Sequence, residues 1–499
     1  MRRPSSSWIT WIVGSLLALA VATWGCQGGT DERLLGGSDT TGTTAAPDDA
    51  TGSAGLGDEY FPYAGNGGYD ALSYTITLTC DPATGRLAGT TVVKAEALQA
   101  LNTMNLDFSG LEISRLEVDG TPATYERQAH ELVVECPQPL KTGQIFSVAV
   151  TYSGKPVGLT SADGYPEGWQ WVDDTIFTLD EPEGAATWFP LNDHPSDKAT
   201  YEFNLTVPAQ YTATANGLLV EVKEQGGEKT FVWRMDQPMA NYLAAVAVGE
   251  FVLQETASPA GVPIRNYFDV AVAEQGREAF ARTGEVLDYF SALFGPYPFD
   301  VYGVVVPDAT VGAAMENQTI SLFGRDVVEQ TMTDPVVGQM FLSHELSHQW
   351  FGDSVTLAEW QDIWINEGFA TYASWLWAEH DMGQEGMDIW VQWALESLAS
   401  ADETPTGDPG VKDLFGASVY ERGGLTMHAL RLTLGDELFF GILRDWVGRY
   451  AYGIATTEDF IALVKQKAGH LQGVDLDAFF QGWLYDEKMP ALPEAAVTG

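Results

Sequence analysis

Cysteine is scarce in this chain of 499 residues, which contains only Cys26, Cys80 and Cys136. So few thiols cannot build a disulfide framework, so the fold must depend on a hydrophobic core. If Cys26 is modified at an export signal, Cys80 and Cys136 are left as a pair, each after a strand-like run. The sequence therefore leaves open one disulfide, between Cys80 and Cys136, but does not show that the two residues have the geometry that such a bond requires.

Basic residues are also scarce: 25 lysines and arginines stand against 69 aspartates and glutamates, which gives a formal net charge of −44. Nucleic acids are bound by clusters of basic side chains, so this balance argues against a nucleic-acid partner. We expect most of the acidic excess to form a solvated surface that keeps the protein soluble. Attraction of cationic peptides by this charge is the weaker alternative.

The N-terminus predicts export. Two arginines precede an apolar run of 17 residues from Trp8 to Trp24, and Gly25 comes just before Cys26. This arrangement is typical of a secretory signal over residues 1–25, and the run is short for a membrane span of about 20 residues. Cys26 resembles the lipidated cysteine of bacterial lipoproteins, although the two residues before Gly25 depart from the usual pattern. We expect either a cell-envelope lipoprotein anchored through Cys26 or a secreted bacterial protein.

Hydrophobic periodicity divides the rest of the chain into an α+β protein of two domains. Residues 26–56 are rich in small and polar residues and predict a flexible linker. Residues 57–256 show period-two runs between turn signals, which predicts an antiparallel β domain. Residues 257–499 become mainly helical. The clearest strands are 74–78, 145–152, 200–207, 230–234 and a short piece at 301–306, and later helices are expected at 421–434, 436–450, 457–468 and 475–485.

Histidine is scarce as well, with seven in the chain, so the spacing of His344 and His348 is informative. A chance His-Glu-x-x-His match in such a chain has a probability of about 1%. Residues four apart share one face of a helix, so both imidazoles can point at one metal ion. Asp334-Pro335 suits the start of such a helix and Gly352 its end. The alternative is an amphipathic helix with two structural histidines.

Glu367, nineteen residues after His348, can return on a second helix and complete the metal site. Three protein ligands with one open position are typical of catalytic rather than structural zinc, so we expect one Zn²⁺ per chain on His344, His348 and Glu367. Glu345 lies beside the ligands and can act on a metal-bound water. The other histidines have no such spacing, and we expect structural roles for His130, His194, His380, His428 and His470.

Several separate stretches together resemble the aminopeptidase N family of zinc enzymes, the gluzincin aminopeptidases related to leukotriene hydrolase. The resemblance covers about residues 60–490 and implies a saddle-like N-terminal β domain followed by a mainly helical, thermolysin-like catalytic domain. Its motifs are the zinc motif with Glu367, Met315-Glu316-Asn317, Ser418-Val-Tyr420-Glu-Arg-Gly423, Glu181-Pro-Glu-Gly184 with Trp188-Phe-Pro190, and Asn192-Asp-His-Pro-Ser-Asp-Lys-Ala199.

The resemblance also implies roles for individual residues. Glu345 matches the general base, and Tyr420 matches a phenol that donates a hydrogen bond to the oxyanion of the tetrahedral intermediate. Glu316 matches the carboxylate that binds the free α-amino group of the substrate, and Glu181 matches a second anchor on the β domain. The rest of the exopeptidase motif is expected to bind substrate as well, through Ala313, Ala314, Met315 and Asn317.

The chain departs from the family pattern in two ways. Ala313 stands where the exopeptidase motif usually begins with glycine, and its methyl group bears on substrate fit more than on the chemistry. The sequence also ends at Gly499, without the large C-terminal helical domain of longer members. We expect a cleft that is more open to solvent and to longer peptides.

The sequence thus predicts a zinc aminopeptidase that releases N-terminal residues from peptides with a free N-terminus. Two alternatives stay open. One is a thermolysin-like endopeptidase that shares only the zinc motif, and the other is a non-catalytic peptide-binding surface protein on the same scaffold. The sequence does not predict the preferred N-terminal residue or the oligomeric state.

Overall fold

The computed structural model of the chain describes residues 50–128, 130–161, 164–401 and 404–493. The predicted signal over residues 1–25, Cys26 and most of the predicted linker lie outside this range. Residues Ala50–Gly499 form one compact unit. Among the described residues, no helix is long and apolar enough to cross a membrane.

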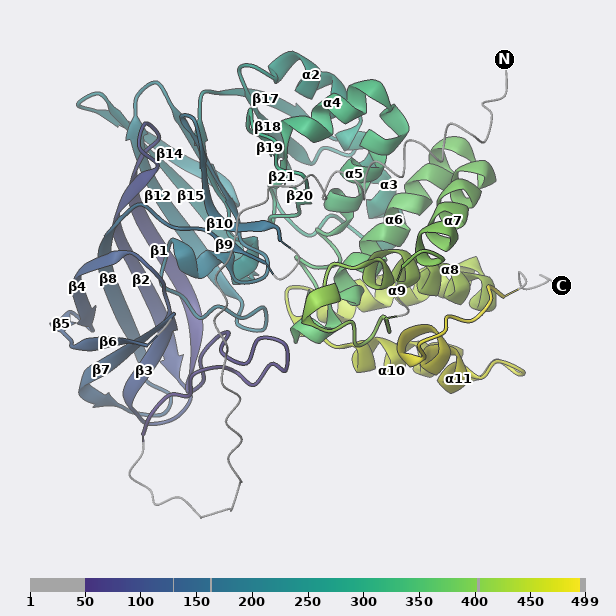
Figure 1. Cartoon of the computed structure of the whole chain (residues 1–499), viewed down its shortest axis with the longest axis horizontal. Helices are drawn as coiled ribbons and strands as arrows, with labels where there is room; N and C mark the ends of the chain where they lie inside the picture. The colour runs from purple at the N-terminus through teal and green to yellow at the C-terminus, as the bar shows by residue number, and fades with distance from the viewer. Residues whose placement is uncertain (1–49, 129, 162–163, 402–403, 494–499) are drawn as a thin grey trace, which may run out of the picture. The chain divides into compact units, whose positions relative to one another are not determined.

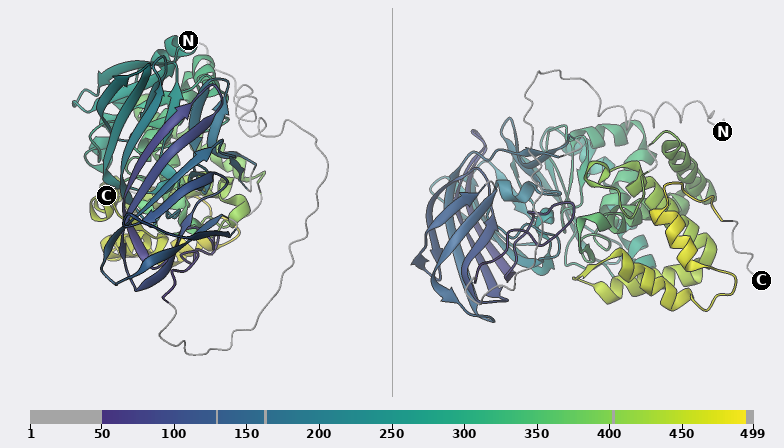
Figure 2. Two further views of the ribbon diagram at one scale, coloured as in Figure 1. Left: turned by 90° about the vertical axis from the view of Figure 1, so that its left-hand side faces the viewer. Right: turned by 60° about the horizontal axis from the view of Figure 1, so that its bottom comes forward.

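The N-terminal part of this unit is built on an eight-stranded sheet (Figure 1). Every second side chain along β12 is buried, as expected for a sheet that packs one face on a core. The left view of Figure 2 shows the long strands of this sheet side by side. Its pairs are antiparallel except β1 with β12, and the order is β14 (Leu218–Gln225), β15 (Glu228–Met239), β12 (Ala199–Pro208), β1 (Tyr69–Asp81), β2 (Arg86–Ala97), β8 (Ile145–Gly154), β4 (Glu112–Val118) and β5 (Thr121–Pro122).

The strands predicted at 74–78, 145–152, 200–207 and 230–234 all lie in this sheet and are confirmed. Two smaller sheets complete the β-rich part. One has the order β13 (Thr212–Ala215), β16 (Val246–Gly249), β11 (Thr175–Leu179), β10 (Pro166–Val172) and β9 (Leu159–Thr160). The other has the order β3 (Leu101–Asp107), β7 (Glu131–Leu140) and β6 (Tyr125–Gln128).

The two cysteines of this part are free thiols. Cys80 is buried on β1 of the large sheet, and Cys136 is half-buried on β7 of the three-stranded sheet. The disulfide that the sequence left open between them is therefore not formed. The β-rich fold is held by its core, as the low cysteine content predicts.

A further sheet precedes the helices, where the sequence predicted mainly helix. The predicted strand at 301–306 is present in shorter form as β19 (Val304–Val306). By contrast, β18 (Pro263–Asp269) was missed because residues 266–269 are all buried, so the strand lacks the period-two pattern of a half-buried strand. Parallel neighbours such as β18 and β19 need a crossover, which α2 (Ala273–Ala279) and α3 (Thr283–Phe294) supply. The sheet has the order β17 (Phe251–Ala257), β18 (Pro263–Asp269), β19 (Val304–Val306), β21 (Ser321–Phe323) and β20 (Ala314–Met315), so it already begins before the predicted boundary at residue 257.

Helices dominate the rest of the chain, as predicted (Figure 1). Helix α6 lies at the centre of this part, is buried without a break from Trp364 to Ala378 and contacts α5, α7 and α8. The predicted helices 436–450 and 457–468 match α9 and α10, whereas 421–434 and 475–485 each include a π-helical turn. The helices are α4 (Arg325–Thr333), α5 (Pro335–Ser347), α6 (Trp364–Met382), α7 (Gln384–Leu398), α8 (Gly423–Leu434), α9 (Asp436–Tyr450), α10 (Thr457–Ala468) and α11 (Leu476–Phe480).

Residues 50–56, the end of the predicted linker, are packed against the β-rich part. Thr51 forms a β-bridge with Thr103, and Ala54 forms one with Asn66. The composition of this stretch predicted a flexible tether, but small residues also allow a backbone to approach its neighbours closely. The linker prediction is therefore wrong for these residues.

The next residues connect the start of the unit to its helical part. The carboxylate of Asp58 is buried and accepts a hydrogen bond of 2.8 Å from the backbone N–H of Trp360. The hydroxyl of Tyr60 donates to Asp408 at 2.5 Å and accepts from the backbone N–H of Gly410 at 2.8 Å. This segment therefore holds both the approach to α6 and the loop before residue 411.

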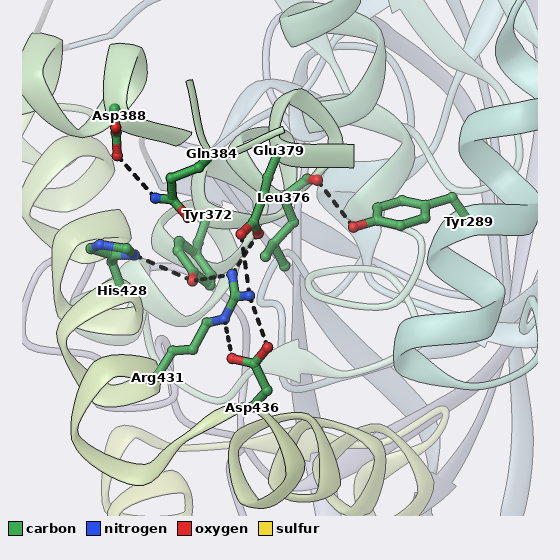
Figure 3. Close-up of polar contacts among 9 residues, drawn as sticks. All are labelled: Tyr289, Tyr372, Leu376, Glu379, Gln384, Asp388, His428, Arg431 and Asp436. Atoms are coloured by element: carbon green, nitrogen blue, oxygen red, sulfur yellow. Dashed lines mark hydrogen bonds and ion pairs between the residues drawn. The ribbon is translucent and has the colours of Figure 1, made fainter. Parts of the chain in front are cut away.

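An ion-pair network joins α6 to α8 (Figure 3). The guanidinium of Arg431 donates to Glu379 at 2.6 and 3.3 Å and to Asp436 at 2.7 and 3.2 Å. It also donates to the hydroxyl of Tyr372 at 3.4 Å, and that hydroxyl lies 3.4 Å from Nδ1 of His428. One fixed cation on α8 thus satisfies acceptors from α6 and from the start of α9.

Candidate active site

Helix α5 carries the His-Glu-x-x-His segment. The side chain of Asp334 accepts hydrogen bonds from two backbone N–H groups of the first turn, at 3.1 and 3.4 Å, and Pro335 occupies the first helical position. This confirms the predicted start of the helix. The regular helix ends at Ser347, with His348 as its C-cap, so the predicted end at Gly352 is too late.

The three predicted metal ligands converge on one point. Nε2 of His344 and Oε2 of Glu367 are 3.1 Å apart, Nε2 of His348 and the same oxygen are 3.4 Å apart, and the two Nε2 atoms are 3.1 Å apart. Glu367 lies in the first turn of α6, so the site joins the end of one helix to the start of the next. Burial acts to raise the pKa of Glu367, but the two imidazoles outweigh it and lower that pKa to about 2.

These separations fit a tetrahedral zinc ion. Zinc binds histidine nitrogens and carboxylate oxygens at about 2.0–2.2 Å, so two ligands in tetrahedral geometry lie roughly 3.3 Å apart. The three edges between the donors of His344, His348 and Glu367 are 3.1, 3.1 and 3.4 Å. Three such donors leave the fourth position for water or substrate. The site residues therefore fit a catalytic zinc.

The ring of His348 is fixed by the backbone behind it. Its Nδ1 lies 2.9 Å from the carbonyl oxygen of Phe351, and a carbonyl only accepts, so Nδ1 carries the proton and Nε2 is free for the metal. Gly352 follows with a φ of +127°, where a Cβ would stand 3.2 Å from that Nδ1 and 3.4 Å from the side chain of Asn366. The glycine thus leaves room for both metal-bearing segments.

Glu345 lies beside the metal donors with a largely buried side chain, 6% exposed. One ligand atom each of Glu345, Glu316 and His348 lies within 4.8 Å of the others. Burial raises the pKa of Glu345 well above its usual value, and a bound divalent cation would act in the opposite direction. The carboxylate is therefore next to the open metal position, as the predicted base must be.

Glu316 and Glu181 bring two further carboxylates to the site. Glu181, Glu316 and Glu367 each place an oxygen within 4.8 Å of the other two. Oε1 of Glu181 and Oε1 of Glu316 are buried and have no hydrogen-bond partner among the described residues. Burial raises the pKa of Glu316 to about 7 and raises the pKa of Glu181 well above its usual value. Such a surplus of buried acceptors is suited to a cationic group.

The predicted exopeptidase motif lies on an edge strand beside α5. Ala314 and Met315 form β20, which pairs with β21, and Ala313 precedes it. These three residues line the site cavity, whereas Asn317 is buried away from it and its Oδ1 has no partner among the described residues. Gly312, one position before Ala313, has a φ of +75°, so glycine serves the turn there.

Tyr420 lies on the π-helical turn Ser418–Arg422, opposite the zinc helix. Its ring stacks on that of His344 with centroids 5.9 Å apart and planes 25° apart. It lines a cavity of about 240 Å³ together with Glu181 and the exopeptidase strand. Burial raises the pKa of Tyr420 well above 10, so the phenol stays protonated and can donate.

Gln349 is a positioning residue that the sequence did not reveal. Its side chain donates to the carbonyl of Glu316 at 3.0 Å and accepts from the backbone N–H of Thr319 at 2.9 Å and from the hydroxyl of Tyr297 at 3.2 Å. The exopeptidase strand is thereby held against the end of α5. Its place directly after His348 is the one signal that could have drawn attention to it.

Lys198 is a second positioning residue. It lies in the stretch 192–199, which stood out in the sequence only because it resembles the family pattern. Its ammonium donates to the carbonyls of Asp353 and Ser354 at 2.8 and 3.2 Å and to the hydroxyl of Thr356 at 2.9 Å. These residues form the loop that follows His348. Burial lowers the pKa of Lys198 to about 7, although Asp353 opposes that shift. A cation directly before β12 thus holds the loop behind the metal ligands.

The fold and the site together define a class. A β-rich part is followed by a helical part, in which two histidines of a His-Glu-x-x-His helix and a glutamate of the next helix form a metal centre beside a further glutamate. This is the arrangement of the zinc metallopeptidases that carry this motif.

The comparisons with known proteins identify the family. The family described as "Peptidase M1 N-terminal domain" matches residues 70–243, and the family described as "Peptidase family M1 domain" matches residues 278–483. The structure of an M1 zinc metallopeptidase from Deinococcus radiodurans is 30% identical, with 89% of this chain and 100% of that chain covered and a TM-score of 0.80. The chain belongs to peptidase family M1, its fold class is as predicted, and its cofactor is zinc.

Two other matches describe the range of the similarity. A variant of the Deinococcus radiodurans metallopeptidase bound to a Tyr-Ser-Ala substrate is 30% identical, with 88% of this chain and 99% of that chain covered and a TM-score of 0.78. Aminopeptidase M1 of Arabidopsis thaliana is 32% identical over 307 residues, which are 58% of this chain and 35% of the relative. The chain spans between 35% and 48% of the length of the curated relatives it matches.

Proposed function

We propose that this chain is a zinc aminopeptidase that hydrolyses the first peptide bond of peptides with a free N-terminus. The observation that carries the proposal is the pair of unpartnered carboxylate oxygens of Glu181 and Glu316 beside the zinc ligands. A peptide ammonium would pair with both. Its α-carbon and first carbonyl would then lie next to the metal, so that only the first peptide bond is in position.

Each remaining side chain of the site has a role in this reaction. When bound on His344, His348 and Glu367, zinc polarises the scissile carbonyl and lowers the pKa of its water to about 7. Glu345 takes a proton from the attacking water and passes it to the nitrogen of the departing amine. The hydroxyl of Tyr420 donates a hydrogen bond to the carbonyl oxygen as that oxygen gains negative charge.

The relatives support this proposal. Curated relatives with 30–32% identity include aminopeptidases of Arabidopsis thaliana and of rice. Solved structures of two-domain M1 zinc metallopeptidases, 31% identical to this chain, carry the amino acids L-arginine and L-tryptophan. Free amino acids are the products that an aminopeptidase releases, and each presents an ammonium group to its site.

The proposal is tested with anilides of single amino acids and their N-acetylated counterparts, incubated with the purified zinc-loaded protein. We expect hydrolysis of the free forms only, and loss of hydrolysis after zinc is removed by a chelator. Return of activity on adding zinc separates removal of the metal from denaturation of the protein.

The same measurement separates the two alternatives. Cleavage of acetylated or internal-only peptides at a rate similar to that of free peptides would mean a thermolysin-like endopeptidase. Tight binding of peptides with zinc present but no turnover of any substrate would mean a non-catalytic peptide-binding protein. The fit of substrate beside Ala313 is examined by comparing the wild type with Ala313→Gly.

We also propose that the chain is exported, either as a lipoprotein modified at Cys26 or as a secreted protein. The support is the N-terminal sequence, with its basic start and its apolar run up to Trp24. The test is expression in a bacterium followed by fractionation and mass measurement of the mature N-terminus. A diacylglycerol mass on Cys26 means lipidation, which Cys26→Ala abolishes, whereas an unmodified shortened chain in the medium means secretion.

A further inference from the structure

A second cavity adjoins the substrate cavity. Its volume is about 300 Å³, against about 240 Å³ for the substrate cavity. Ser161 and Phe415 line both cavities, so the two share a wall. Glu181 lines the substrate cavity, and Pro182 and Glu183, the next two residues, line the second. The second cavity therefore begins directly beside the anchor proposed for the substrate ammonium.

Two carboxylates line this second cavity. Glu167 lies on β10 and is only 4% exposed. The Oε2 of its side chain accepts a hydrogen bond of 3.3 Å from the backbone N–H of Glu183. Glu183 is itself half-buried, and Asp58 adds negative charge near it. Within the part of the chain that the structure describes, neither cavity is lined by a lysine, arginine or histidine.

The electrostatics of this cavity favour a cationic occupant. Burial raises the pKa of Glu167 to about 7 and also raises that of Glu183. Both carboxyls are thus held in surroundings where their ionised forms lack a compensating charge. A guanidinium or ammonium group beside them would stabilise the ionised forms and be stabilised in turn.

The surfaces of the two cavities together suit one kind of side chain. With the substrate ammonium at Glu181 and Glu316, the first side chain leaves the neighbouring α-carbon and meets apolar walls, such as Leu179, Met315 and Phe415. The second cavity, which shares Phe415 with the first, is lined by the carboxylates of Glu167 and Glu183. A long apolar stem that ends in a positive charge matches this sequence of surfaces, and lysine and arginine have such side chains.

We propose that this enzyme prefers substrates whose first residue is arginine or lysine, and that Glu167 and Glu183 bind the charged end of that side chain. The proposal rests on the aminopeptidase function proposed above and adds the substrate class. The second cavity with Glu167 and Glu183, here called the acidic pocket, would be a specificity determinant. It is separate from Glu181 and Glu316, which bind the ammonium of every substrate.

The test compares the anilides of arginine and citrulline, because citrulline keeps the shape of arginine and lacks its charge. Leucine anilide serves as a substrate that does not use the acidic pocket. Wild-type protein is expected to hydrolyse arginine anilide with a kcat/KM roughly 10- to 100-fold above that of citrulline anilide, the factor typical of a hydrogen bond to a charged group. Equal values for the two substrates, with leucine hydrolysed, would overturn the substrate class and leave the aminopeptidase function standing.

Two variants test the residues. Glu183→Gln and Glu167→Gln are each expected to bring the arginine-to-citrulline ratio toward 1, and the ratio cancels any effect that both substrates share. Glu126→Gln, on the exposed strand β6, makes the same change of charge and is expected to keep the wild-type ratio. If Glu167→Gln does not fold, Glu183→Gln alone decides, because that side chain is half-buried.

The outcomes separate the two proposals. A ratio that stays at the wild-type value in Glu183→Gln and in every folded Glu167 variant would overturn the role of this pocket. No hydrolysis of any of the three substrates by zinc-loaded wild type would overturn the aminopeptidase function and the substrate class with it. A ratio lowered in the pocket variants and kept in Glu126→Gln supports both.

Discussion

Helix α6 carries two polar clusters of opposite kind, one partly exposed and one buried. Near its last turns, Glu379 is paired with Arg431, which also binds Asp436, so a fixed cation compensates the acids (Figure 3). At its first turn, Glu367 meets further glutamates and two imidazoles, and carboxylate oxygens of Glu181 and Glu316 have no partner among the described residues. Buried charge alone therefore does not mark a functional site. Acceptors that the fold leaves unpaired do mark such a site, because the free energy lost by burying them is recovered only when a ligand binds.

The largest effect is expected from Glu345→Gln in the cluster at the zinc site, where carboxylate oxygens of Glu181 and Glu316 are unpaired within the described part of the chain. The amide cannot take the proton of the attacking water, so kcat should fall by about 10²–10⁴-fold, the usual contribution of a general base. The zinc content per chain should be unchanged, since His344, His348 and Glu367 are intact. Zinc analysis alongside kcat is the measurement, and retained zinc with an unchanged rate would contradict the assignment of the base.

A smaller effect on the same cluster is expected from Glu316→Gln. Loss of one charged acceptor for the substrate ammonium should lower kcat/KM for free peptides by about 10- to 100-fold. Any slow hydrolysis of acetylated peptides should not change, because they carry no ammonium. Steady-state kinetics on both substrate forms provides the check, and an equal loss on the two would count against the anchoring role.

The paired cluster is formed by Arg431, Glu379 and Asp436. There we expect the reverse pattern, in which stability is lost and catalytic activity is retained. Arg431→Met removes the partner of Glu379, and because this pair is partly exposed the free energy of unfolding should fall by about 2 kcal/mol, between the values for surface and buried pairs. The kcat/KM of the folded variant should stay near the wild-type value. Urea unfolding measures the first quantity, with Arg277→Met on an exposed part of α2 as the matched control. A variant as stable as that control would contradict the structural role.

A further effect at the paired cluster concerns pH. Burial, aided by Arg431, lowers the pKa of His428 to about 4. An unfolded histidine has a pKa of about 6.5, so between these values the unfolded state binds more protons and this residue makes the protein less stable as pH falls. In His428→Gln this dependence is gone, so the stability gap between wild type and variant should shift in favour of the variant from pH 6.5 down to 4. Urea unfolding across that range is the measurement, and parallel curves would refute the prediction.

The zinc site was predictable because its signal is local. A four-residue spacing on one helix fixes the direction of His344 and His348, and Glu367 follows on the next helix in the same buried core. The periodicity of the long strands was predictable for the same reason. Each of those patterns is a property of a few consecutive residues, so it survives without knowledge of the rest of the fold.

The rest of the site depends on contacts between distant segments. Lys198 and Gln349 gain their roles from loops and strands that no spacing in the sequence connects to them. The two glutamates of the acidic pocket, Glu167 and Glu183, come from a strand and a loop that meet only in three dimensions. Residues 50–56 were misjudged because a composition of small residues is shared by mobile tethers and by closely packed backbone.

The contacts of Asp58 and Tyr60 also bear on the order in which the molecule is completed. Their partners Trp360 and Gly410 lie 302 and 350 positions further along the chain. Synthesis proceeds from the N-terminus, so these two contacts cannot form until most of the chain has been made. Contacts of such high sequence separation form slowly, because the chain between them must first be ordered. The loop that leads to Tyr420 is therefore among the last parts to be fixed, and a growing chain that already contains the whole zinc motif still lacks a finished substrate cavity.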